Sequence, residues 1–124
     1  MSPNALWLPY QVSDVDSAVR YFTDHIGLSQ VDEWRRDGEH GAVLRVADGA
    51  YLEFVSPQMG SQPETVVPLA FELSSVREVD ELFIRWSPSD EDIVHRPHTY
   101  PRGHYGFELR GGPAGAHVMV WSES

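Results

Sequence analysis

The chain carries the same pattern twice, and this repeat limits its possible folds more than any other feature. The segment LPYQVSDVDSAVRYF aligns with LAFELSSVREVDELF at an offset of 61 residues, which places Leu8 on Leu69 and Phe22 on Phe83. Apolar positions coincide along both copies. Repetition at this period indicates a duplicated supersecondary unit. The fold should therefore contain two similar halves.

Each copy begins as a strand and continues as a helix. Apolar residues first alternate with other residues, which is the period of a strand. An S-x-x-D pattern at Ser13 and an S-x-x-E pattern at Ser75 are typical of helix starts. Apolar residues then recur at helical spacing, until Gly27 in one copy and Pro88 in the other, and both are residues that end helices. These signals predict helices over residues 14–26 and 75–86.

Three strand-like runs follow each helix. Asp37-Gly38 and Asp48-Gly49 are strong hairpin signals. A segment rich in Pro, Gly, Ser and Gln separates the halves and is typical of a linker. The predicted strands are residues 29–36, 41–47, 50–56, 93–98, 104–110 and 117–122. The predicted division of the single domain is module one at 4–57, linker at 58–65 and module two at 66–122.

Composition excludes several classes of protein. The 124 residues include no cysteine, which rules out disulfides, thiolate metal sites and a cysteine nucleophile. No apolar run approaches the ~20 residues of a membrane span, and the N-terminus does not resemble a secretory signal. We therefore expect a cytoplasmic protein without a membrane partner. The net charge of −10 would repel nucleic acid and attract cationic ligands, although acidity can also serve solubility alone.

The two halves resemble the vicinal oxygen chelate superfamily, which includes glyoxalase I, extradiol dioxygenases, and fosfomycin- and bleomycin-resistance proteins. VSDVDSAVRYFTDHIGL resembles its opening signature, AYLEFVSP its fourth strand, PLAFELSSVREVDEL the start of its second module and GFELRGGPAGAHVMVW its closing motif. The usual Asp-Pro-Asp-Gly turn of that motif is replaced by Gly112-Pro113-Ala114-Gly115. The resemblance implies an α+β fold in which two βαβββ modules form a cupped, partly open mixed sheet with helices outside. It also implies a ligand in the cup and a homodimer.

The strand alternation then assigns side chains to faces. One set should pack under the helices: Leu8, Tyr10, Leu52, Phe54, Val118 and Val120. The other set should face the cup and form the ligand site: Trp7, Gln11, Tyr51, Glu53, Glu72, His117, Met119 and Trp121.

The resemblance also locates the metal-ligand positions of metal-dependent members, and the residues there do not suit a metal. The four positions fall on Trp7, Glu53, Pro68 and Met119. Only the carboxylate of Glu53 can ligate a hard or borderline divalent ion, since Trp and Pro side chains cannot ligate and a thioether is a poor ligand. We therefore expect no metal and no other cofactor.

The histidines offer no clear alternative. His95 and His98 are three residues apart and should face opposite sides of a regular strand, unless a turn at Pro97 brings them together. His104 and His117 lie on different predicted strands and might face one another. Hydrogen-bonded or solvated histidines at strand ends are the simpler interpretation.

Three hypotheses for function remain. The first is a metal-free protein that sequesters an aromatic or cationic small molecule, such as an antibiotic, through Trp7, Trp121 and Glu53. The second is a lyase, isomerase or dioxygenase of the same superfamily, either metal-dependent or with Glu53 and Glu72 as an acid–base pair. The third is a regulatory module with a vestigial cup. The aromatic residues might also simply fill a core.

Overall fold

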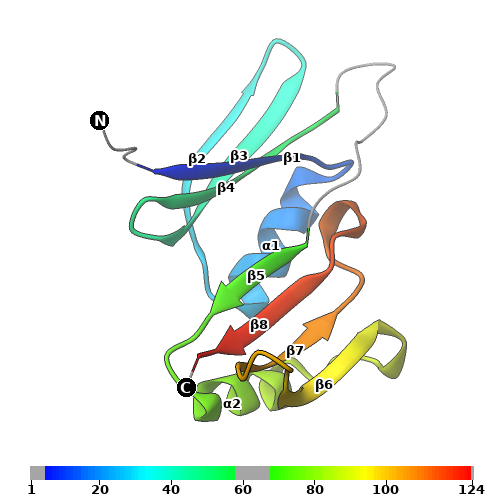
Figure 1. Ribbon diagram of the computed structural model, residues 1–124. Helices are drawn as coiled ribbons and strands as arrows, with labels where there is room; N and C mark the ends of the chain where they lie inside the picture. The colour runs from blue at the N-terminus through cyan, green and yellow to red at the C-terminus, as the bar shows by residue number, and fades with distance from the viewer. Residues whose placement is uncertain (1–4, 58–67, 124) are drawn as a thin grey trace. The chain divides into compact units, whose positions relative to one another are not determined.

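The computed structural model describes residues 5–57 and 68–123, and each of these two ranges forms one compact unit (Figure 1). The linker predicted at 58–65 lies outside the described residues. Within the described residues, no helix combines the length and apolar character that crossing a bilayer requires.

The first unit has the element order βαβββ. Its bounds are β1 Leu6–Gln11, α1 Val15–His25, β2 Ser29–Arg36, β3 Glu39–Ala47 and β4 Ala50–Val55. The strands form one sheet in the order β1-β4-β3-β2. β1 runs parallel to β4, and the other pairs are antiparallel, so the sheet is mixed.

The second unit repeats this arrangement. Its bounds are β5 Leu69–Glu72, α2 Val76–Trp86, β6 Ile93–Thr99, β7 Tyr105–Leu109 and β8 Val118–Ser122, with short 3-10 turns at Asp90–Asp92 and Pro113–Gly115. The sheet order is β5-β8-β7-β6, again with a parallel first pair. The predicted α+β class and the two βαβββ modules are confirmed. A single cup lined by both modules stays a prediction.

The two helices correspond residue by residue in the repeat. α1 and α2 each have 11 residues, and their first residues, Val15 and Val76, are separated by the 61-residue offset found in the sequence. Gly27 follows the C-cap Ile26 with a positive φ of 80°, so it ends α1 as predicted.

The helix starts confirm one predicted cap and correct the other. Ser75 caps α2, because its side chain accepts a hydrogen bond from the Glu78 backbone N–H. In α1 the cap is Asp14, which accepts from the Ser17 N–H at 3.0 Å, and the prediction of Ser13 is wrong. Asp14 occupies the position equivalent to Ser75 in the repeat, so both helices begin at the same point of the module.

The apolar core lies between each sheet and its helix. In the first unit the rings of Phe22 and Phe54 stack with centroids 5.7 Å apart. In the second unit the buried cluster is Val79, Leu82, Phe107, Leu109 and Val120. Of the residues predicted to pack under the helices, all are buried except Leu8, which is half-buried.

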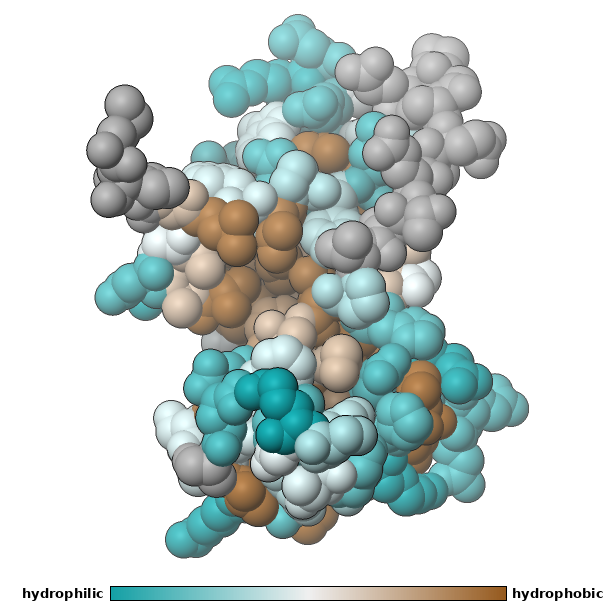
Figure 2. Space-filling view, in the orientation of Figure 1, coloured by the Kyte–Doolittle hydropathy of each residue, from teal (hydrophilic) through white to brown (hydrophobic). Residues whose placement is uncertain are grey.

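The other face of each sheet is open. Trp7 and Glu72 are exposed, and the remaining six residues predicted to face the cup are each partly exposed. Within each unit the alternation therefore assigns the two faces correctly. Hydrophobic surface also gathers over β1 and β4 of the first unit, where Leu6 is exposed (Figure 2).

Candidate functional site

The open face of the first unit carries an aromatic pair. The rings of Trp7 on β1 and Tyr51 on β4 stack with centroids 4.5 Å apart and an interplanar angle of 27°. The two residues are direct neighbours in the parallel pair, and Glu53 lies beside Pro9 in the next row. Gln11 ends the same strand, and its Oε1 is shielded from solvent without a hydrogen-bond partner among the described residues. This face therefore presents a flat aromatic surface beside polar groups.

A second feature of this unit lies at the β2–β3 hairpin, at Trp34. The indole Nε1–H donates to Glu39 Oε2 at 2.7 Å. The ring covers Gly41 so closely that a side chain at Gly41 would collide with it. A shallow hollow of about 510 Å³ is lined by Asp32, Trp34, Arg36, Asp37 and Glu39.

The open face of the second unit carries a longer series of rings, which we call the ring ladder: His95, His98, Tyr100, His104 and Trp121. Successive members are in contact. The ring centroids are 5.4 Å apart for His95 and His98, 4.2 Å for His98 and Tyr100, 4.8 Å for Tyr100 and His104, and 5.0 Å for His104 and Trp121. The Tyr100 and His104 rings are nearly parallel, at 6°. The ladder thus joins β6, the β6–β7 turn and β8.

Three polar atoms of the ring ladder have no hydrogen-bond partner among the described residues. They are Tyr100 Oη, His104 Nδ1 and Trp121 Nε1, and all three are shielded from solvent. Burial, followed by the charge of Glu108, raises the pKa of Tyr100 above its usual value, so its hydroxyl stays a donor at neutral pH. Most buried polar groups in proteins have partners, and unpaired ones require an explanation.

Beside the ladder, a carboxylate orients a histidine. His117 Nδ1 lies 2.7 Å from Glu108 Oε2, and the Glu108 side chain is only 17% exposed. An ionised carboxylate can only accept, so this contact favours a proton on Nδ1, and in the neutral imidazole Nε2 is then the acceptor. Met119 on β8 is the direct cross-strand neighbour of Glu108 on β7. The pair and the ladder share the open face.

The predicted site residues are divided equally between the two units. Trp7, Gln11, Tyr51 and Glu53 belong to the first unit, whereas Glu72, His117, Met119 and Trp121 belong to the second. Within the second unit, Glu72 and Trp121 are direct neighbours in the β5–β8 pair.

Two expectations about histidines are corrected. His95 and His98 do not face opposite sides, because the β6–β7 register shifts between them. The three residues from His95 to His98 on β6 lie opposite only two on β7, from Glu108 to Gly106, and the two histidine rings meet. The irregularity at Pro97 brings the rings together, which was the open alternative. His104 does not face His117, because it precedes β7 while His117 precedes β8, at opposite ends of an antiparallel pair.

The metal positions implied by the resemblance do not fit a metal. Trp7 is engaged with Tyr51, Pro68 precedes β5, and Met119 offers only a thioether. Only Glu53 remains, and one carboxylate is not a site for a catalytic divalent ion. Among residues 5–57 and 68–123, the one group of three potential ligands within 4.8 Å of one another is Asp16, Glu33 and His40, on the helix side of the first sheet.

Sequence reasoning missed much of the ring ladder. It assigned Trp121 and His117 to the site but not His95, His98, Tyr100, His104 or Glu108. The signal was the density of histidine and tyrosine in residues 95–104 beside Pro97 and Pro101. In this segment the strand does not keep its regular two-residue period, so alternation cannot predict which side chains share a face of the sheet. Trp34 was also missed, although it lies on a correctly predicted strand.

Comparison with known proteins agrees with the fold. The chain matches solved structures of a glyoxalase/bleomycin resistance protein/dioxygenase from Nocardioides (21% identity, TM-score 0.71, covering 98% of this chain and 84% of that one) and lactoylglutathione lyase from Agrobacterium tumefaciens (24%, 0.70, 98% and 96%). It also matches TioX from Micromonospora sp. ML1 (18%, 0.68, 96% and 95%). No curated protein matches. The family model for the Glyoxalase/Bleomycin resistance protein/Dioxygenase superfamily matches residues 5–118. The chain belongs to this superfamily.

Proposed function

We propose that this chain binds an aromatic or cationic small molecule, such as an antibiotic, and sequesters it without chemical change. The observation that carries the proposal is the ring ladder with its three unpaired polar atoms, on a sheet face that no helix of the same unit covers. A planar ligand with polar substituents matches this chemistry, since ring faces give contact area and the polar atoms give orientation.

The energetics favour an occupant. A buried polar group without a partner costs about 1–3 kcal/mol. A ligand that reaches Trp121 Nε1, His104 Nδ1 and Tyr100 Oη would remove this cost. Glu108 lies close enough to Tyr100 to raise its pKa, and Glu72 neighbours Trp121, so negative charge on this face favours a cationic group. The net charge of −10 acts in the same direction at longer range.

The proposal also covers the cofactor content, the partners, the oligomeric state and the location of the protein. Three of the four metal positions implied by the family hold residues that cannot serve as good ligands for a divalent ion, which supports binding without a metal or other cofactor. The partner is a small molecule, not nucleic acid or membrane, as the acidic composition favours. A homodimer, which the family resemblance implies, and a cytoplasmic location, which the composition favours, remain part of the proposal.

The experiment is a titration of the chelator-treated protein with a panel of cationic aromatic compounds, followed by tryptophan fluorescence and calorimetry. We expect Trp121→Ala to weaken binding of any ligand found by at least about tenfold, because it removes a ring and a donor. Trp7→Ala and Glu53→Gln test the residues predicted to dominate affinity in the first unit. Trp86→Phe is the matched control, because Trp86 packs against the core of the second unit.

If Trp121→Ala and Trp86→Phe bind the ligand equally well, the ladder is not the site. Loss of binding on chelation would show that the ligand needs a metal, and would favour the enzyme hypothesis instead.

A second candidate function rests on the His117–Glu108 pair. A carboxylate that holds Nδ1–H leaves Nε2 available as a general base. This geometry favours a metal-free isomerase or lyase of the superfamily. Mass spectrometry and NMR of the ligand before and after incubation separate the two functions. An unchanged ligand supports sequestration, whereas conversion that His117→Asn abolishes and Glu108→Gln slows would establish catalysis.

A further inference from the structure

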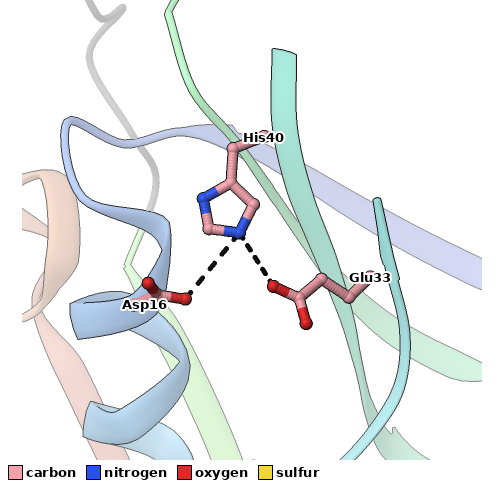
Figure 3. A group of neighbouring side chains, drawn as sticks. All are labelled: Asp16, Glu33 and His40. Carbon is pink, nitrogen blue, oxygen red and sulfur yellow. Dashed lines mark hydrogen bonds and ion pairs between the residues drawn. The ribbon is translucent and has the colours of Figure 1, made fainter. Parts of the chain in front are cut away.

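Asp16, Glu33 and His40 come from three elements and converge on one point (Figure 3). Asp16 lies in the first turn of α1, Glu33 on β2 and His40 on β3. His40 Nε2 lies 3.0 Å from Glu33 Oε2 and 3.7 Å from Asp16 Oδ1. Glu33 pairs with Ala42 across the hairpin, and Ala42 is buried under α1, so the group lies on the helix side of the sheet. It therefore lies on the opposite side of this sheet from the open face of the first unit.

The spacing of the three atoms suits a divalent cation. Zinc bonds to imidazole nitrogen and carboxylate oxygen are about 2.0–2.2 Å long, so ligand atoms around a tetrahedral ion stand about 3.3–3.6 Å apart. The two distances from His40, 3.0 and 3.7 Å, bracket this value, and the two carboxylates lie within 4.8 Å of each other. One imidazole and two carboxylates form a donor set that borderline ions such as Zn²⁺ accept, with water completing the coordination.

The fold holds the histidine in place without a metal. The His40 backbone N–H donates to Ser56 Oγ at 3.0 Å, and its carbonyl accepts from the Ser56 N–H at 2.8 Å. The His40 side chain is only 18% exposed, whereas Asp16 and Glu33 are 53% and 44% exposed. A partly buried imidazole on a fixed backbone and two accessible carboxylates leave an approach from solvent.

Arg35 is the competitor for this position. Its guanidinium lies 3.2 Å from Asp16 Oδ2 and 3.6 Å from Glu33 Oε2. Its Nη2 also donates to Asp16 Oδ1 at 3.5 Å, so a metal must displace the guanidinium from both carboxylates. The positive charge of Arg35 also opposes a second cation at the group. The site should therefore bind a metal more weakly than the same three ligands would alone.

We propose that Asp16, Glu33 and His40 bind one borderline divalent cation, with Zn²⁺ as the representative ion, and that this ion fastens α1 to the β2–β3 hairpin. The site is structural, since all three ligands lie on the helix side of the sheet. It is independent of the small-molecule function, and of the family's metal positions on Trp7, Glu53, Pro68 and Met119.

The test is Zn²⁺ binding to the chelator-stripped full chain, measured by calorimetry and by the shift in melting temperature. Exposed histidines elsewhere in the chain can also take up added zinc, so the measurement is the difference between variants. We expect His40→Asn to remove one equivalent of Zn²⁺ and abolish its stabilising effect. Asp16→Asn and Glu33→Gln should each weaken that equivalent by at least about tenfold. Arg35→Met should strengthen it, because it removes the competing charge.

Glu81→Gln is the matched control. Glu81 pairs with Arg77 at 2.8 Å on α2, so the variant also removes one carboxylate from an arginine ion pair, away from the proposed ligands. Its zinc binding should equal that of the wild type. Equal zinc binding by the wild type, His40→Asn and Asp16→Asn would overturn the proposal, as would weaker binding by Arg35→Met. The two carboxylate variants keep the test decisive if His40→Asn fails to fold.

Discussion

At the scale of residues, Gly106 shows how the open face of the second unit depends on a position without a side chain. It is the direct neighbour of Trp121 in the β7–β8 pair, and a methyl group there would collide with the backbone of Val120 and Trp121. The close approach of these strands sets the position of the Trp121 ring. The glycine was visible in the sequence, but its role depends on a register that only the structure gives.

Tyr105 makes a single-residue prediction about stability. Its hydroxyl donates to Asp80 Oδ1 on α2 at 2.6 Å, and this bond is the main reason that the Tyr105 pKa is raised. Tyr105→Phe should lower the free energy of unfolding at pH 7 by about 1 kcal/mol, at the low end for a charged acceptor because water reaches the pair. Urea unfolding measures this change.

The pH dependence follows from the direction of that shift. Because the folded-state pKa of Tyr105 is raised, its contribution is complete below the unfolded value of about 10 and is lost as the pH rises through the folded value. Wild type and Tyr105→Phe should therefore converge in stability above that pH. A constant difference between them from pH 7 to pH 11 would contradict the assignment.

At the scale of elements, the two helix caps test the equivalence of the repeats. Asp14→Ala and Ser75→Ala should each lower the free energy of unfolding by about 1 kcal/mol, because each removes the side chain that accepts from the third backbone N–H. Ser13→Ala should have little effect. Thermal unfolding of the three variants compares them directly, and a larger loss at Ser13 than at Asp14 would disprove the assignment of the α1 cap.

The turn before β8 contains a residue whose backbone conformation is strained for its side chain. Ala114 has a positive φ of 57°, a region that disfavours residues other than Gly, Asn and Asp. It stands where the family motif has Asp. Ala114→Gly and Ala114→Asp should each stabilise the protein, by about 0.5–1 kcal/mol. Calorimetric melting measures this gain, and a loss of stability in both variants would show that the turn is not strained.

These elements also show what the sequence could predict. Helical spacing located both helices to within a residue, because each helix has one face on a core. β2 was also located correctly although its side chains are nearly all exposed, and the Asp37-Gly38 hairpin signal marks its end. The ring ladder could not be predicted, because the β6 register shift at Pro97 and the chain reversal after Tyr100 place its rings together. The cluster of Asp16, Glu33 and His40 likewise forms only when α1 packs on the sheet, and no local sequence pattern predicts that contact.

At the scale of the whole molecule, the duplication gives each unit one covered and one open sheet face. The covered faces hold the core, so the open faces are free to differ. The first carries the Trp7–Tyr51 pair, and the second carries the ring ladder and the His117–Glu108 pair. One module has thus produced two chemically distinct surfaces, and the more polar of them, on the second unit, is the proposed ligand site.

The most direct test of this account is the ¹⁵N-labelled indole spectrum of the chelator-treated protein, recorded while a ligand found by titration is added. We predict that the Trp121 indole N–H resonance shifts in proportion to bound ligand, because this donor has no partner among the residues that the structure describes. Trp34, bonded to Glu39, and Trp86, packed on the core, should not move. An unmoved Trp121 resonance at saturation, or a shift confined to Trp34, would contradict the account.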